Sequence, residues 1–88
     1  MGETLTFGQV LTELKNGERV SRVGWHGKGM YLELQTPDEH SKMTRPYIYI
    51  SIPVGEKGSP DGSEVIYDLV PWLASQTDLL SDDWYLVN

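Results

Sequence analysis

The fold depends on how the chain turns in one segment, Val23-Gly24-Trp25-His26-Gly27-Lys28-Gly29-Met30. Three glycines within six residues leave the backbone free to adopt positive φ angles and allow a ligand to come close. Between the glycines, Trp25 offers a stacking surface, His26 a titratable ring and Lys28 a cation. This composition suits a flat anionic ligand. An equally favoured alternative is a plain β-hairpin turn in which Trp25 folds over the core.

The residues on either side of this segment alternate in polarity, as strands do. Arg19-Val20-Ser21-Arg22 predicts a short strand before it. After it, Met30, Leu32 and Leu34 share one side of a second strand. Arg22 could reach a bound phosphate, but a solvated charge at the sheet edge is the favoured interpretation.

A helix is predicted near the N-terminus. Thr6 can cap it, and Gln9 stands three residues later, which completes the pattern of a capping box. Gly17 supplies the left-handed residue that ends it. The apolar stripe expected to face the core consists of Phe7, Val10, Leu11 and Leu14.

The middle of the chain carries two further strand signals. Residues 36–45 form a polar connection, and residues 47–52 follow as the strongest strand, with isoleucines on one face and tyrosines on the other. That pattern suggests a sheet covered on both sides. Residues 54–63 are expected to form a surface loop, and residues 65–70 a strand stopped by Pro71.

The C-terminal part combines a second capping signal with aromatic residues. Ser75 and Asp78 have capping-box spacing and predict a short helix through Leu80, followed by a strand over residues 84–87. A helix N-terminus is a ready anion site, to which Ser75, Gln76 and Thr77 would add donors. The alternative is that Ser75 and Asp78 only cap the helix while Trp72 and Trp84 only pack.

Composition bounds the possible functions. The 88 residues are expected to form one domain, residues 1–88, with a net charge of −6 that disfavours binding to a nucleic-acid backbone. The absence of cysteine excludes disulfides and thiolate metal sites. No signal peptide or spanning segment is visible, so a soluble intracellular protein is expected. The elements predict a small single α+β domain, an antiparallel sheet with an N-terminal helix and a short C-terminal helix.

Two stretches together resemble the signatures of a known family, the second Thoeris anti-defence family of phage proteins. They are residues 24–30 (GWHGKGM) and residues 71–84 (PWLASQTDLLSDDW). The leading helix, from Phe7 to Gly17, is similar as well, so the resemblance spans nearly the whole chain. One departure is His26, where members of the family usually carry Asn. The segment between Val54 and Ser63 also varies, and nothing carries over there.

This resemblance implies a sponge rather than an enzyme, acting in the cytoplasm of the bacterial host. Proteins similar to this one bind glycocyclic ADP-ribose, the alarm signal of Thoeris defence, and leave it unaltered. Some relatives also take up cyclic oligonucleotides of another defence system. Members assemble as tetramers with ligand pockets between subunits. The resemblance implies neither a cofactor nor a metal, and no membrane or nucleic-acid polymer as partner.

Chemistry and motif position then suggest a role for individual residues. Trp25 suits stacking on the adenine, and backbone N–H groups near Gly27 and Gly29, together with Lys28, suit the pyrophosphate. Thr77 and Asp78 could bind ribose hydroxyls or the adenine amino group. The full set of expected ligand-binding residues is Trp25, His26, Gly27, Lys28, Gly29, Met30, Trp72, Ser75, Gln76, Thr77 and Asp78. The flanking glycines favour a Trp25 ring presented on a loop, whereas Trp84 is expected to be core.

Two other classes of function compete with this one. A nucleotide hydrolase would need a cluster of metal-binding carboxylates or an activated nucleophile, and the aspartates form no recognised metal loop. His26 and His40 are not placed as a catalytic pair. A protein-interaction module would instead use Trp72, Trp84 and the tyrosines as its interface.

Overall fold

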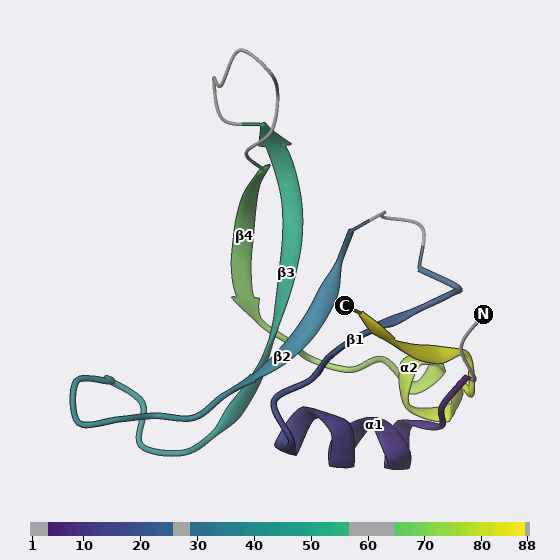
Figure 1. The fold of residues 1–88 in the computed structure, drawn as a ribbon, viewed down its shortest axis with the longest axis horizontal. Coiled ribbons are helices and arrows are strands. Elements are labelled where there is room, and N and C mark those ends of the chain that lie inside the picture. Colours follow the sequence, from purple (N-terminus) through teal and green to yellow (C-terminus); the bar gives the residue numbers. More distant parts are fainter. Residues whose placement is uncertain (1–3, 26–28, 57–64, 88) are drawn as a thin grey trace.

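The computed structural model describes residues 4–25, 29–56 and 65–87, which form one five-stranded antiparallel sheet and two helices. The strand order is β4-β3-β2-β1-β5 (Figure 1). The elements are α1 (Phe7–Lys15), β1 (Arg19–Arg22), β2 (Tyr31–Gln35), β3 (Tyr47–Glu56), β4 (Val65–Pro71), α2 (Gln76–Leu80) and β5 (Trp84–Val87). The predicted α+β architecture with an N-terminal helix and a short C-terminal helix is confirmed.

Helix α1 begins and ends where its capping residues predict. The Thr6 hydroxyl accepts a hydrogen bond from the Gln9 N–H while the Gln9 side chain accepts one from the Thr6 N–H. Gly17, just past the helix, has a φ of 86° and therefore a backbone that favours glycine. Val10 and Leu14 are buried, but Leu11 is 38% exposed, so the buried stripe is narrower than expected.

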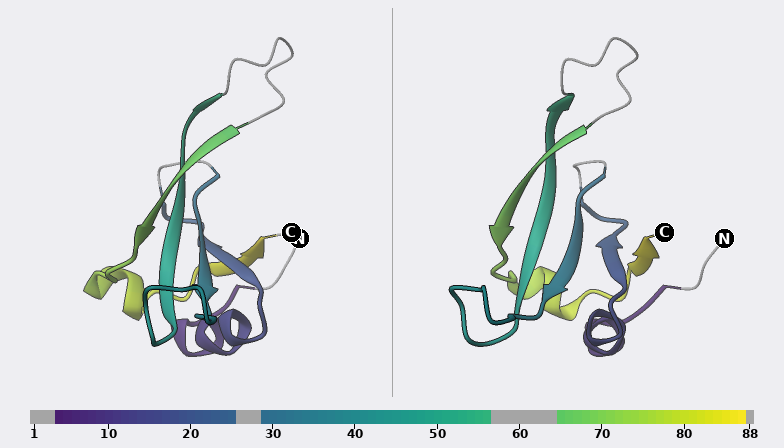
Figure 2. Two further views of the ribbon diagram at one scale, coloured as in Figure 1. Left: turned by 90° about the vertical axis from the view of Figure 1, so that its left-hand side faces the viewer. Right: turned by 60° about the vertical axis from the view of Figure 1, so that its left-hand side comes forward.

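The core lies where α1 packs against β1, β2 and β5. Val20 of β1 pairs with Leu32 of β2, and both are fully buried together with Val10, Leu14 and Trp84. Both helices lie towards the same end of the molecule, away from the end of β3 and the start of β4 (Figures 1 and 2). The packed core is therefore small and concentrated at one end.

Strand β3 is longer than predicted. It continues past Ile52 to Glu56, so residues 54–56 of the expected loop belong to the strand, and residues 57–63 of that prediction lie outside the described residues. Pro53 is tolerated because β2 pairs with β3 only as far as Ser51, and the β3–β4 register shifts between Pro53 and Gly55. The hairpin consequently projects beyond the other strands (Figure 1).

The connection from β4 to β5 carries α2 across the molecule from one sheet edge to the other. Its short helix has the predicted capping box between Ser75 and Asp78. β5 then pairs antiparallel with β1, which sets Trp84 opposite Arg22. Neither of the two described helices has the length and apolar character needed to cross a bilayer.

Candidate functional site

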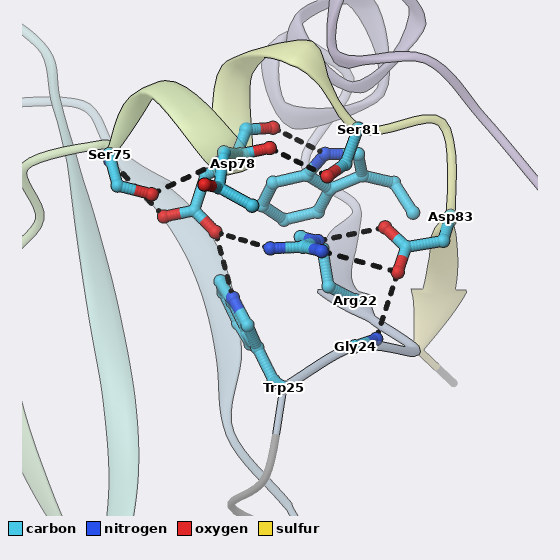
Figure 3. Close-up of polar contacts among 9 residues, drawn as sticks. Arg22, Gly24, Trp25, Ser75, Asp78, Ser81 and Asp83 are labelled. Carbon is cyan, nitrogen blue, oxygen red and sulfur yellow. Dashed lines mark hydrogen bonds and ion pairs between the residues drawn. The ribbon is translucent and has the colours of Figure 1, made fainter.

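Five residues from two distant parts of the chain meet where β1 ends (Figure 3). Arg22, Gly24 and Trp25 come from the end of β1 and the segment after it, and Asp78 and Asp83 come from α2 and the approach to β5. We call this group the Arg22 network. It contains two of the expected site residues, Trp25 and Asp78, and it joins the two stretches that carry the resemblance.

Arg22 is the centre of the network. Its Nε donates to Asp83 Oδ1 at 2.8 Å and its Nη2 to Asp83 Oδ2 at 3.4 Å, while Nη1 donates to Asp78 Oδ1 at 2.8 Å. The Arg22 side chain is only 11% exposed. The interpretation of Arg22 as a solvated edge charge is therefore wrong, because its position opposite Trp84 directs it towards the packed face of the sheet.

Gly24 is fixed by the same ion pair. Its N–H donates to Asp83 Oδ2 at 2.9 Å. A Cβ atom at this position would lie 2.7 Å from Arg22 Nη2 and 3.0 Å from Asp83 Oδ2, which is too close. Glycine is needed here for close approach, whereas Gly29 has a φ of 82° and is needed for its backbone conformation.

Trp25 is half-buried and is held by both a hydrogen bond and ring packing. Its Nε1–H donates to Asp78 Oδ1 at 3.0 Å. Its ring contacts Trp84 edge to face at 5.2 Å between centroids and Trp72 at 6.5 Å. The ring therefore belongs partly to the core and is not simply displayed on a loop. Trp84 itself is fully buried, as predicted.

Asp78 connects this indole to helix α2. Its Oδ1 accepts from both Arg22 and Trp25, which uses the two acceptor positions of that oxygen. Its Oδ2 accepts from the Ser75 N–H at 3.2 Å, and its backbone carbonyl accepts from Trp84 Nε1 at 3.0 Å. The carboxylate is thus occupied chiefly by the protein's own donors.

Charge and burial oppose each other at Asp78. Burial works to raise the pKa of its carboxyl, but hydrogen bonds from Trp25, Arg22 and Ser75 together outweigh burial and hold that pKa below its ordinary value. At Asp83 the hydrogen bond from Arg22 dominates and lowers the pKa. The bond to Asp83 in turn raises the pKa of Arg22. All three groups are consequently charged at neutral pH.

The remaining expected site residues are distributed around the network. Trp72 packs against Trp25, while Ser75, Gln76 and Thr77 lie in the exposed first turn of α2 and its cap. Gly29 and the half-buried Met30 lie at the start of β2. His26, Gly27 and Lys28 fall outside the described residues. Over 4–25, 29–56 and 65–87, no three histidine, cysteine or acidic side chains gather as metal ligands would.

The pairing of Arg22 with Asp83 was not predicted from the sequence. A signal was present, because Arg22 stands two residues from Val20 and therefore shares its core-facing side of the strand. An arginine on that side must find carboxylates, since buried charges are paired. Nothing in the sequence pattern, however, distinguishes Asp83 from its exposed neighbour Asp82.

The chain is thus a small α+β domain in which three packed tryptophans lie beside the ion pairs of Arg22 with Asp78 and Asp83. The chain belongs to the Thoeris anti-defense 2-like family, whose domain description matches residues 5–87. It is also 32% identical, over an alignment of 95 residues covering 100% of both chains, to the protein named Thoeris anti-defense 2 of Bacillus phage SP01. Its family is thus one of phage anti-defence proteins directed against Thoeris.

Proposed function

We propose that the chain binds a cyclic ADP-ribose-type signal, glycocyclic ADP-ribose, and sequesters it without chemical change in the cytoplasm of the bacterial host. The observation that carries this proposal is the anchored indole of Trp25, whose hydrogen bond to Asp78 joins residues 24–30 to residues 71–84. An aromatic platform contributes roughly 1–3 kcal/mol per stacked base. Fixing the ring before binding reduces the entropy lost on association.

The chemistry of the site supports binding rather than catalysis. Its two described carboxylates accept hydrogen bonds from Arg22, and their pKa values are lowered. A general acid near neutral pH requires the opposite shift. Gln76 and Thr77 are exposed in the first turn of α2 and could donate to ribose or phosphate oxygens. The net charge of −6 argues against a nucleic-acid polymer as the partner.

The test is a binding experiment followed by recovery of the ligand. The protein is titrated calorimetrically with a panel of cyclic ADP-ribose isomers and cyclic oligonucleotides, and bound material is released by heat and analysed by mass spectrometry. We expect one cyclic ADP-ribose isomer to bind and to be recovered intact. Recovery of an altered nucleotide would indicate an enzyme, and binding of none of the panel would favour the protein-interaction alternative.

We also propose that the chain acts as a homo-oligomer, namely a tetramer, as the family resemblance implies. It exposes 6616 Å², whereas a folded monomer of its 10.0 kDa mass is expected to expose about 5,200 Å². Its radius of gyration is 14.2 Å, against about 12 Å expected for this length. Such an open shape is stabilised when further copies cover part of it.

The surface best suited to that contact lies on the β3–β4 hairpin. Tyr31, Ser51 and Leu69 lie in line across β2, β3 and β4 on the face opposite Val20 and Leu32. Leu69 is 64% exposed on the edge strand, and Tyr67 beside it is 38% exposed. Exposed apolar groups on an unpaired edge are typical of a contact between chains.

Native mass spectrometry of Leu69→Asp tests the oligomer. We expect the parent to be a tetramer and the variant to shift towards smaller species, because the new carboxylate would be buried without a partner. Leu80→Asp is the matched control, since Leu80 is 83% exposed but lies on α2. A parent that is monomeric at micromolar concentration would rule out the oligomer.

A further inference from the structure

We infer that Arg22 and Asp83 are positioning residues for the ligand site: they fix the segment that carries Trp25 against α2. This inference rests on the function proposed above, because it explains how Trp25 is held in place in the proposed ligand site. It concerns two residues that need not touch the ligand. Both are connected to Trp25 through hydrogen bonds that the structure contains.

Asp83 holds the backbone at the start of the segment. Its Oδ2 accepts from the Gly24 N–H at 2.9 Å, while the same carboxylate receives two donors of the Arg22 guanidinium. A bidentate arginine–carboxylate pair fixes direction as well as distance, because both groups are planar. The residue directly before Trp25 is therefore held in one place.

Asp78 holds the indole N–H of Trp25 itself. Nη1 of Arg22 and Nε1 of Trp25 donate to one oxygen, Asp78 Oδ1, at 2.8 and 3.0 Å (Figure 3). The carboxylate cannot rotate freely, since its second oxygen accepts from the Ser75 N–H. The Trp25 N–H is thus tied to α2 through Asp78, and the backbone just before Trp25 is tied to Asp83 and Arg22.

A purely structural role would be to keep β1 and β5 together, but the strands do not need the ion pair for that. They are paired over four positions from Arg19 to Arg22, and the Val23 N–H donates to the Asp83 carbonyl at 3.1 Å. What the side chains add beyond this ladder is the placement of Gly24 and Trp25. Changing the Arg22 or Asp83 side chain should therefore first alter the position of the Trp25 indole.

The test compares Arg22→Lys and Asp83→Asn with Arg19→Lys. Lysine keeps the charge of Arg22 but has no planar fork, and asparagine keeps the shape of Asp83 but not its charge. Arg19 is the matched control, because it lies on the same strand and pairs with Glu33 at 3.6 Å, but its side chain is 47% exposed. Using two variants of the network keeps the test valid if one of them fails to fold.

Three quantities are measured for each variant: the melting temperature, the indole N–H resonances of a ¹⁵N-labelled sample, and the affinity for the cyclic ADP-ribose isomer that the parent binds. We expect the Trp25 indole resonance to shift or broaden in both network variants, while that of Trp84, bonded to the Asp78 backbone, stays in place. Affinity should fall about tenfold or more, and Arg19→Lys should match the parent.

Two results would overturn the inference. One is an unchanged Trp25 resonance with parental affinity in Arg22→Lys and Asp83→Asn. The other is a joint loss of the Trp25 and Trp84 resonances with a collapsed melting temperature in both variants, which would show a general structural role. A parent that binds no isomer would instead refute the proposed function, and the Trp25 resonance by itself would then decide whether Arg22 and Asp83 position the ring.

Discussion

Trp25 combines packing and hydrogen bonding in one side chain. One part of the ring contacts Trp84 and Trp72, and its N–H is bound by Asp78. Removing the ring and removing only its N–H therefore have different consequences. This difference allows the contribution of Trp25 to folding to be separated from its contribution to binding.

We predict that Trp25→Ala lowers the free energy of unfolding by about 2 kcal/mol, roughly half the 3–5 kcal/mol typical of a fully buried aromatic residue. The same change should weaken binding of the signal at least about tenfold, because losing ~1.4 kcal/mol already does so. Urea unfolding and calorimetric titration measure the two effects.

Trp25→Phe and Trp84→Ala complete that experiment. Phenylalanine keeps most of the packing but leaves Asp78 without its indole donor, so binding should suffer more than stability. Trp84 is fully buried, and its replacement by alanine should cost about 3–5 kcal/mol. A folded Trp25→Ala protein that binds as tightly as the parent would refute the stacking role.

The Tyr49 hydroxyl makes the stability of the fold depend on pH in the alkaline range. Burial, and then the hydrogen bond that its hydroxyl donates to Glu33 at 2.9 Å, raise the pKa of Tyr49 from 10.0 to about 12. Because this pKa is higher in the folded than in the unfolded chain, the stability it contributes is complete below pH 10 and is lost as the pH rises towards 12.

Absorbance of the phenolate measures this titration directly. We expect a late ionisation step near pH 12 that disappears in Tyr49→Phe. Tyr47→Phe, on the same strand but 37% exposed, should retain it. A late step that persists without Tyr49 would contradict the assignment.

Among the elements, α1 depends most clearly on its end residues. Its capping box stands directly after Leu5, which exchanges two backbone hydrogen bonds with Trp84 at 2.7 and 3.2 Å. The cap therefore sets where the N-terminal segment ends its pairing with β5 and enters the helix that covers the core. A weakened cap should affect the whole domain and not only the first turn.

We predict that Thr6→Ala lowers the free energy of unfolding by about 1 kcal/mol, since the Gln9 N–H loses its acceptor. Thr12→Ala is the control, because Thr12 is an exposed residue in the interior of the same helix, where alanine has the higher helix propensity. Thermal unfolding of both variants measures the difference. Equal melting temperatures for the two would show that the cap contributes nothing.

At the scale of the whole molecule, the Arg22 network makes part of the stability depend on pH. This part matters because only five hydrophobic side chains of the described residues are buried. The carboxyls of Asp78 and Asp83 have pKa values below the ordinary 3.8, so the unfolded chain takes up protons at these groups before the folded chain does. Their contribution to stability is therefore complete above about pH 4 and is lost as the pH falls further.

Urea unfolding between pH 7 and pH 3 tests this dependence. We predict a decline in the free energy of unfolding below about pH 4. The decline should be shallower in Asp83→Asn, because that variant lacks one of the two carboxyls whose proton uptake is linked to unfolding. Asp82→Asn is the control, since Asp82 is the exposed neighbour of Asp83. An identical acid slope in the parent and both variants would contradict the linkage.

The local structure could be predicted from the sequence, because it depends on residues close together in the chain. The capping boxes of Thr6 with Gln9 and Ser75 with Asp78 each lie within four residues, and alternation alone set the faces of residues 30–34 and 47–52. The family resemblance rested on motifs equally contiguous in the sequence.

The roles of Arg22, Gly24 and Trp25, in contrast, depend on contacts that form only in the folded chain. Their partners Asp78 and Asp83 are 53 to 61 residues away, and no local pattern states which carboxylate an arginine will meet. The pairing of β5 with β1 brings Asp83 to the end of β1, and the crossing of α2 brings Asp78 there. A long-range ion pair exists only after the sheet has formed, which is why the sequence pattern left Arg22 at the surface while the fold placed it at the centre of the site.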